Sequence, residues 1–423
     1  MKGFELSGWL DFWRRPRFSP DRIRAYQDAR VRRLVEHAWA RIPYYRRLME
    51  AAGLRPADIR TRASLARFPI TRRRDLQGVP LDDLIAPGVD PEKCIGFSTS
   101  GTTGEPVRML RTRREQYLLF GFRLRAQISS GLRPLDRRVK LGSTPVRLLP
   151  HRIGLFRVTN IDLNLGPAEI LRRLQELRPH VIYGIPNMLE MLAKTAPAGA
   201  VESLRPRLIF SGAEPLHPSL RCELKRLFGC PVIDFYGCHE FNLMAWQCSR
   251  CGLYHTSDDS AVVEVLRADG QAAAPGEQGE VFGTALHSYA MPFIRLEIGD
   301  VVTRPARRPA CEIEFDAIDE IRGRTADFLP LPGGRMLSPY HLSLAVDSVP
   351  GVQRYQILQT ALDHVRILYV RMEGAGEETG AKIASKCREY LPPEVAIETK
   401  AVAHIPLTAA GKHRLVQAFR SFS

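Results

Sequence analysis

A run rich in glycine and hydroxyl groups, STSGTTGEP, occupies residues 98–106. Glycine allows the backbone to approach a ligand closely with its N–H groups turned inward, and Ser and Thr hydroxyls add donors for phosphate oxygens. The run lacks the lysine and the spacing of a Walker A loop. It is therefore interpreted either as a phosphate-binding loop of another kind or as a plain surface loop.

Metal-ligand spacing appears in QCSRCGLYH, residues 247–255. Its C-x2-C-x3-H array offers the side chains of Cys248, Cys251 and His255. Two thiolates and an imidazole at such spacing favour a zinc site. The alternative is that these cysteines are free thiols in the core, because cysteine is often buried.

Two further segments place polar residues directly after apolar, strand-like runs. SGAEP (211–215) follows RLIF, and DFYG (234–237) ends the run PVIDFYG. In α/β proteins, ligands bind beyond the carboxyl ends of the strands. Both segments are therefore candidates for a binding site.

The surrounding sequence must supply the strands and helices that position these segments. Between about residues 139 and 320, short β-rich runs alternate with amphipathic stretches. The β-rich runs are VIYGI, RLIFSG, PVIDFYG, AVVEVL and GEVFGTAL, and the amphipathic stretches are AEILRRLQEL and PSLRCELKRLFG. This alternation predicts an α/β fold of layered helices and sheets, with some antiparallel strands in its later part.

The two ends of the chain have their own patterns. Residues 21–55 are predicted to be helical, with Gly53 ending the last helix, and the Trp-rich segment before them to be a helix that packs on the domain or lies on a membrane surface. After a boundary near 324–327, the strand pair RYQILQ and HVRILYVRM, the helix AKIASKCREYL and a final strand predict a small α+β domain. The predicted domains are therefore 1–324 and 325–423.

Composition limits the classes of protein that the chain can belong to. The 423 residues suggest two or three domains, and the 44% apolar content is ordinary for a globular enzyme. No apolar run reaches the ~18 residues that a membrane span needs. The eight cysteines are dispersed and no secretion signal is recognisable, so we expect a cytoplasmic protein without a disulfide framework.

The net charge of +15 comes largely from arginine-rich runs such as TRRRD and LRTRRE. Aromatic residues do not interleave with these runs, and no signature of a nucleic-acid-binding module appears. Solvated arginine-rich helix faces explain the charge most simply. A site for polyphosphate, for an acidic carrier protein or for the phosphates of a coenzyme is the alternative.

Taken in chain order, seven segments resemble motifs of the AMP-forming, adenylate-forming enzymes. The closest resemblance is to the phenylacetate–CoA ligase branch, which includes homologues of capsular-polysaccharide biosynthesis. The segments span nearly the whole chain and are IPYYRRLMEAAGLRPADI with SLARFPITRRRDL, STSGTTGEP, IFSGAEPL, DFYGCHE, MPFIRLEIGD, IRGRTADF and IPLTAAGKHR. Each motif alone is weakly specific, but seven in order are strongly so.

The resemblance implies a large N-terminal domain that binds ATP and the acyl group, and a small mobile C-terminal domain. It implies two half-reactions: a carboxylate attacks the α-phosphate of ATP to give an acyl-adenylate and pyrophosphate, and a thiol then displaces AMP. The implied cofactors are ATP and Mg²⁺, with coenzyme A as co-substrate and an aromatic or arylalkyl acid as substrate. A monomer or a homodimer is expected.

The resemblance also assigns roles to individual residues. Lys412, Glu240 and Thr102 would be catalytic, Glu240 as the Mg²⁺ ligand and Lys412 as the group that stabilises the α-phosphate. Nucleotide-binding residues would be Ser100, Gly101, Thr102, Thr103, Gly104, Gly212, Ala213, Glu214, Pro215, Asp234, Phe235, Tyr236, Gly237, Asp300 and Arg324. The acyl pocket would be lined by Tyr183, Gly184, Ile185, Pro186 and His239, although apolar residues of this kind are equally ordinary core.

Relatives of this branch pair the Cys…His loop with a later Cys-x-Cys just before the GR motif. The corresponding segment here, ACEIEF, contains only Cys311. Cys251 can replace the missing cysteine, so the resemblance predicts one structural Zn²⁺ held by Cys248, Cys251, His255 and Cys311.

Two positions depart from the family pattern: Glu105 stands where relatives usually carry lysine, and Ala326-Asp327 replaces a pair of acids at the hinge. These departures leave a non-catalytic scaffold as one alternative function. A second alternative is an adenylating enzyme that passes its acyl group to an amine or to a carrier-protein thiol. A nucleic-acid-binding protein is a third, motivated by the positive charge alone.

Overall fold

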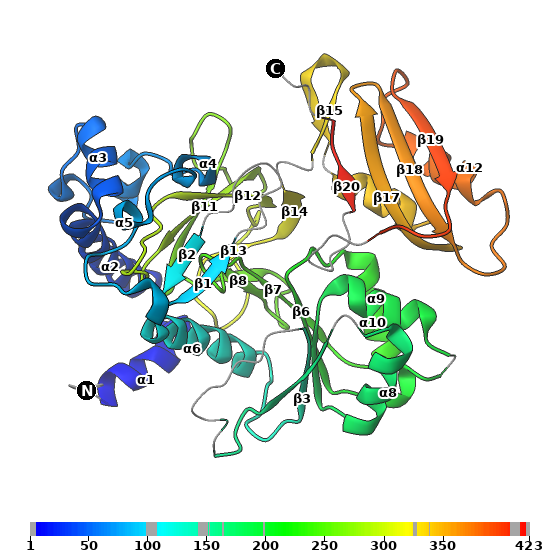
Figure 1. The fold of residues 1–423 in the computed structure, drawn as a ribbon, viewed down its shortest axis with the longest axis horizontal. Coiled ribbons are helices and arrows are strands. Elements are labelled where there is room, and N and C mark those ends of the chain that lie inside the picture. The colour runs from blue at the N-terminus through cyan, green and yellow to red at the C-terminus, as the bar shows by residue number, and fades with distance from the viewer. Residues whose placement is uncertain are drawn as a thin grey trace. The chain divides into compact units, whose positions relative to one another are not determined.

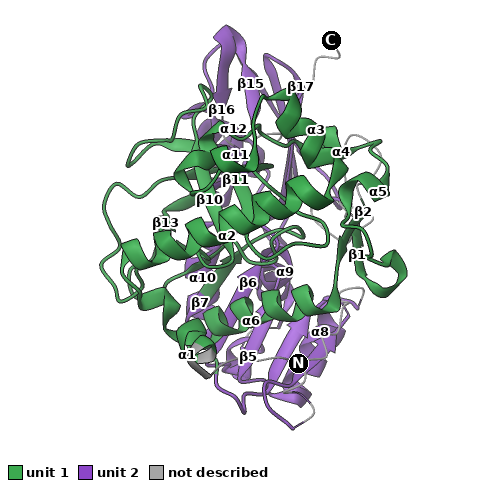
Figure 2. Cartoon of the chain, turned by 90° about the vertical axis from the view of Figure 1, so that its left-hand side faces the viewer, with its two compact units in different colours: residues 1–132, 233–320 green, residues 133–232, 321–423 purple. Residues whose placement is uncertain are grey.

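The computed structural model describes most of the chain (Figure 1). The described residues are 6–98, 108–142, 151, 153–162, 165–197, 199–324, 328–337, 339–406 and 415–419. The chain forms two compact units, the first from residues 1–132 and 233–320 and the second from 133–232 and 321–423 (Figure 2). The predicted α/β class, with a distinct C-terminal part, is confirmed.

Helices open the first unit: α1 (Leu6–Arg14), α2 (Pro20–Arg41) and α3 (Pro43–Ala51). Helix α2 begins after Ser19, whose hydroxyl accepts a hydrogen bond from the Arg22 N–H at 3.5 Å. It ends before Pro43, because proline lacks the N–H that would continue the helix. Gly53, with φ of +65°, follows the end of α3. The predicted helical region 21–55 is confirmed, as two helices.

Helix α1 packs on the unit through its aromatic face. The ring of Phe12 lies 5.3 Å from that of Phe122 on α6 (Arg113–Ser129), and the Arg125 guanidinium lies 4.6 Å from the Phe12 ring centre. The predicted packing of this helix on the domain is therefore confirmed. Within the described part of the chain, no helix is long and apolar enough to cross a membrane.

The strands of the first unit pair antiparallel. One group is β10 (Ala261–Leu266), β11 (Gln278–Ala285) and β12 (Leu296–Thr303), and another is β7 (Val232–Tyr236), β8 (Ala245–Gln247), β9 (Tyr254–Thr256) and β13 (Ala317–Ile318). A hairpin joins β1 (Ile95–Ser98) to β2 (Arg108–Arg111). The short helices α4 (Arg73–Leu76) and α5 (Leu81–Leu84) complete the unit. Apolar residues of α2 and α3 pack with Val262, Leu286 and Ile294 in its core.

The second unit contains a parallel sheet in the order β6-β5-β3-β4. Its strands are β3 (Arg138–Leu141), β4 (Val158–Ile161), β5 (Val181–Gly184) and β6 (Leu208–Gly212), and its helices are α8 (Pro167–Leu177), α9 (Pro186–Thr195) and α10 (Pro218–Phe228). The apolar faces of these helices and strands form one buried cluster. The predicted alternation of strands and helices is confirmed here.

The C-terminal part of the second unit has its own apolar core. Its elements are β14 (Glu320–Arg324), β15 (Leu329–Leu331), β16 (Arg335–Leu337), α11 (Pro339–Asp347), β17 (Val352–Ala361), β18 (His364–Arg371), α12 (Thr379–Arg388), β19 (Ala396–Ala401) and β20 (Val416–Gln417). The predicted strand pair and helix are confirmed. The β15–β16 hairpin was missed inside a turn-rich stretch, and α11 was missed directly after it. The domain boundary near 324–327 stays a prediction.

A buried carboxylate ties several segments of the first unit together. Asp259 is fully buried and accepts two hydrogen bonds from Arg125, both at 2.7 Å, and one from Arg15 at 3.0 Å. Burial alone would raise the pKa of Asp259, but the charges of Arg125 and Arg15 lower it on balance. Beside it, Gln27 on α2 donates to the Asp258 carbonyl at 2.8 Å. The turn before β10 thus holds α2, α6 and the end of α1.

We predict that Arg125→Met destabilises the protein strongly. The substitution leaves a buried carboxylate short of its main partner, which typically costs about 3–5 kcal/mol. The measurement is the urea midpoint of unfolding, with Arg114→Met as control because Arg114 lies exposed on the same helix. Equal midpoints for the two variants would contradict the prediction.

Candidate functional site

Strand β7 ends at Tyr236, and the chain then turns tightly at Gly237. A side chain at Gly237 would place its Cβ 2.4 Å from the Asn242 carbonyl oxygen, so only glycine fits this position. Asn242 itself has φ of +65°, in the left-handed region that asparagine tolerates. This turn sets the position of Glu240, which is 2% exposed.

The Glu240 carboxylate is paired with Arg73 of α4. The Arg73 Nε donates to Glu240 Oε1 at 2.8 Å, and its Nη1 donates to the Ile298 carbonyl at 3.0 Å. Burial would raise the pKa of Glu240, but the Arg73 charge lowers it on balance, so the carboxylate is ionised at neutral pH. Burial and the Glu240 charge together raise the pKa of the neighbouring Cys238 thiol.

A second arginine holds the backbone at the same place. Arg111 of β2 is buried, and its Nη2 donates to the carbonyls of His239 at 2.5 Å and Glu240 at 3.1 Å. Its Nη1 donates to Gln116 at 2.8 Å. The exposed His239 ring stacks on Phe97 at 5.5 Å. Arg73 lies in the matched segment SLARFPITRRRDL but was given no role, because the arginines of that run look alike in sequence.

The structure also brings together two of the predicted nucleotide-binding residues. The Tyr236 hydroxyl donates to Asp300 Oδ2 on β12 at 2.8 Å. Two other predicted residues lie inside the unit: Phe235 is buried, and the buried Asp234 accepts a hydrogen bond from Tyr254 at 2.9 Å. Asp234 and Phe235 thus support the strand, while Tyr236 and Asp300 lie at its end.

In the second unit, the segment after β6 is joined to the start of α9. Ala213 has φ of +73°, which is unusual for a residue with a side chain. Glu214 Oε2 accepts a hydrogen bond from the Asn187 backbone N–H at 3.3 Å. The predicted adenine segment, 212–215, and the predicted acyl segment, 183–186, are therefore neighbours.

The predicted acyl-pocket residues of this unit are largely packed. A Cβ at Gly184 would lie 3.0 Å from Leu189, Ile185 packs against the apolar cluster, and Pro186 is buried. Tyr183 is partly exposed, and Arg324 is exposed at the end of β14. Ile185 and Pro186 therefore contribute to the apolar core of this unit. Ser100, Gly101, Thr102, Thr103, Gly104, Glu105, Ala326, Asp327 and Lys412 lie outside the described residues.

The four predicted zinc ligands converge in the first unit. The sulfur atoms of Cys248, Cys251 and Cys311 and a nitrogen of His255 all lie within 4.8 Å of one another. His255 Nε2 is 3.1 Å from the Cys311 sulfur and 3.7 Å from that of Cys251. Two sulfurs bound to one Zn²⁺ at 2.3 Å in tetrahedral geometry would be about 3.8 Å apart. The donor set and its spacing therefore fit a closed four-ligand zinc site.

The strands and turns around this cluster hold its four side chains together. Cys248 and Cys251 bracket the turn between β8 and β9, and β13, after Cys311, pairs with β9 so that Ala317 opposes His255. His255 Nδ1 lies 3.4 Å from the Phe315 carbonyl, which leaves Nε2 facing the sulfurs. Burial would raise the pKa of the Cys248 thiol, but hydrogen bonds from His255 and from backbone N–H groups lower it to about 6.

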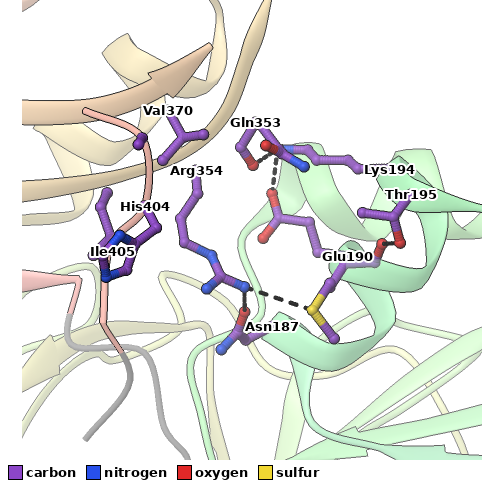
Figure 3. Close-up of a pocket in the computed structure, with 11 residues that line it drawn as sticks. Asn187, Glu190, Lys194, Thr195, Gln353, Arg354, Val370, His404 and Ile405 are labelled. Carbon is purple, nitrogen blue, oxygen red and sulfur yellow. Dashed lines mark hydrogen bonds and ion pairs between the residues drawn. The ribbon is translucent and has the colours of Figure 1, made fainter. Parts of the chain in front are cut away.

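A cavity of about 200 Å³ lies within the second unit, between α9 and strands β17 and β18 (Figure 3). Lys194 Nζ lies 2.7 Å from Glu190 and donates to the Gln353 carbonyl at 3.0 Å. Arg354 donates to the Asn187 side chain at 3.4 Å. Apart from Ile405, which begins the segment IPLTAAGKHR, these lining residues were not singled out in the sequence.

Comparison with known families gives two matches. The family described as AMP-binding enzyme matches residues 149–284, and the family described as CapK C-terminal domain matches residues 331–418. These matches cover the middle of the chain and most of its C-terminal part.

Several characterised relatives match most of the chain. The phenylacetate–coenzyme A ligase of Escherichia coli is 28% identical over 338 residues, which are 74% of each protein. The ligase of the same name from Thermus thermophilus is 27% identical and covers 86% of this chain and 81% of that protein. Protein CapK of Staphylococcus aureus is 23% identical and covers 76% of this chain and 74% of its own length.

Among solved structures, a 2-hydroxyisobutyryl-CoA ligase in complex with 2-HIB-AMP has a TM-score of 0.83 at 20% identity, covering 96% of this chain and 92% of that chain. An anthranilate CoA ligase in complex with anthranoyl-AMP has a TM-score of 0.59 at 19% identity, covering 78% of this chain and 67% of that chain. The fold is thus that of these ligases. The order of the motifs, the two family matches and the sequence relatives together support a place for the chain among the AMP-forming, adenylate-forming enzymes, in the branch of the phenylacetate–coenzyme A ligases.

Proposed function

We propose that the protein is an AMP-forming acid–CoA ligase, which activates a carboxylic acid as an acyl-adenylate and transfers the acyl group to coenzyme A. The observation that carries the proposal is the pair of acids in the first unit: a buried Glu240 paired with Arg73, and Asp300 held by Tyr236. Burial would lower the pKa of Arg73, but nearby acids raise it overall. Glu240 has the largest of these effects and Asp300 also contributes, so both acids interact electrostatically with Arg73. Sequence similarity over most of the chain supports the same activity.

In the first half-reaction, a carboxylate oxygen of the substrate forms a bond to the α-phosphorus of ATP, and the bond from that phosphorus to the pyrophosphate oxygen breaks. The enzyme needs no nucleophile for this step, since it acts by positioning the reactants and stabilising charge. Lys412 is proposed to stabilise the negative charge on the α-phosphate. Asp300 is proposed to accept hydrogen bonds from the ribose hydroxyls.

Glu240 is the residue proposed to hold Mg²⁺, because a carboxylate combined with phosphate oxygens and water suits this ion. When bound, the ion would neutralise charge on the phosphates. The turn at Gly237 and the Arg111 hydrogen bonds to the backbone fix where the Glu240 carboxylate is presented.

In the second half-reaction, the thiol sulfur attacks the carbonyl carbon of the acyl-adenylate. The bond from that carbon to the AMP oxygen breaks, and the thiol proton is released. The names of the relatives favour coenzyme A over an amine or a carrier-protein thiol as the acceptor. Because the chain is also similar to protein CapK, the tests below include an amine and a carrier protein as acceptors.

We propose an aromatic or arylalkyl acid as the substrate class. The support is the similarity to phenylacetate–coenzyme A ligases, together with the partly exposed Tyr183 beside the adenine segment. A zinc ion bound by Cys248, Cys251, His255 and Cys311 is proposed to be structural, because four protein ligands leave no open position for a substrate. It would pin the β8–β9 turn to the segment before β13.

Pyrophosphate release from ATP tests the function. A panel of phenylacetate, benzoate, short aliphatic acids and no acid is expected to give release that depends on an aromatic or arylalkyl acid. Adding coenzyme A, an amine or a carrier protein then identifies the acceptor, by the appearance of the thioester or amide. If no acid of the panel stimulated pyrophosphate release, the proposed activity would be contradicted.

Lys412→Ala is expected to slow adenylation by about 100-fold or more, because removing one group that stabilises developing charge has costs of this size. Thioester formation from supplied acyl-adenylate should stay largely intact, since the thiol attacks the acyl carbon in that step and no pentavalent phosphorus forms. Single-turnover assays of each half-reaction make the comparison. If the rates of both half-reactions fell equally, the proposal that Lys412 acts only in adenylation would be contradicted.

The purified protein is expected to contain about one equivalent of zinc, measured by elemental analysis. Cys311→Ser should lower both the zinc content and the melting temperature, because it removes one of four ligands. Cys222→Ser is the matched control, since Cys222 is exposed on α10 and outside the cluster. Less than about half an equivalent in the parent protein would overturn the zinc proposal.

A further inference from the structure

The segment ITRRRDL, residues 70–76, matched the family pattern but received no role from it. We infer that Arg73 in this segment is a positioning residue for the proposed adenylation site: it aims the Glu240 carboxylate and balances its charge until a divalent cation takes over that balance. This inference rests on the role proposed for Glu240.

Arg73 is held on a rigid support. Thr71 is fully buried, its N–H donates to the Arg295 carbonyl at 3.0 Å, and its carbonyl accepts from the Glu297 N–H at 2.9 Å. These two hydrogen bonds attach the start of α4 to strand β12. The Ile298 carbonyl of the same strand accepts a hydrogen bond from the Arg73 Nη1 at 3.0 Å. The guanidinium is therefore held both by this carbonyl and by the Glu240 carboxylate.

The clamp leaves the Arg73 Nε directed at Glu240. The Glu240 side chain is 2% exposed, while that of Arg73 is 31% exposed. The carboxylate is therefore removed from water and the arginine is not, so the pair is a buried anion with its cation on the open side. A buried carboxylate without a partner is strongly unfavourable. Arg73 is thus the group that makes an ionised Glu240 tolerable at this depth.

The two neighbouring arginines have different environments. Arg72 forms a more exposed ion pair with Glu297, and Arg74 is 76% exposed and lies 3.9 Å from Asp75. The three residues share charge and local sequence but differ in what they contact. Arg74 is therefore a matched control for the loss of one positive charge from α4.

The test is thermal melting of the full-length protein, with and without MgCl2 and without nucleotide or acid. NaCl at equal ionic strength is the reference buffer. Arg73→Gln should lower the melting temperature by about 3 °C or more, because it leaves Glu240 unpaired. MgCl2 should restore part of that loss, whereas Arg74→Gln and the parent protein should not respond to it.

A double variant, Arg73→Gln with Glu240→Gln, keeps the proposal falsifiable if the single variant folds poorly. Removing both charges should recover the melting temperature and abolish the response to MgCl2. The inference is overturned if Arg73→Gln has the same melting temperature as Arg74→Gln. It is also overturned if neither MgCl2 nor the second substitution raises the melting temperature of Arg73→Gln. These readouts need no turnover, so they are separate from a failure of the proposed ligase activity.

Discussion

Three carboxylates in the described part of the first unit are largely removed from water and are paired with arginine. Asp259 lies between Arg125 and Arg15, Glu264 is paired with Arg295 at 3.0 Å, and Glu240 is paired with Arg73. The alternative to pairing is a large cost of desolvation. Arginine meets the requirement well, because its planar head donates several hydrogen bonds at fixed angles. Part of the positive charge of the chain is therefore structural.

The same pairing links the support of the fold to the candidate site. Asp259 fixes the turn that starts β10, and Arg295, beside β12, donates to the carbonyls of Ala66 and Phe68. Strand β12 in turn carries Asp300 and anchors the segment that presents Arg73. A shift of this strand would move both acids of the site together. The buried ion pairs thus hold the proposed nucleotide-binding groups in register with the core.

Local sequence predicted several of the helices and strands and the identity of the functional segments. The runs that became β5, β6, β7, β10 and β11 were apparent from their composition, and C-x2-C-x3-H marked three of the clustered metal-ligand candidates. Helix α11 was missed, because it is short and follows a turn-rich run without a clear period. The role of Arg73 was missed for a different reason: its position in the sequence does not distinguish it from the exposed arginines around it.

The sequence by itself determined the family, the order of the motifs and the kinds of chemical group that they offer, because these depend on residue type and short spacing. Tertiary structure decided which of those groups meet. Arg73 and Glu240 are 167 residues apart, and His255 and Cys311 are 56 apart. Such contacts form only when strand pairing and core packing bring distant segments together, so no local pattern encodes them. For the same reason, only the fold separates the arginine that balances a buried acid from its neighbour that faces water.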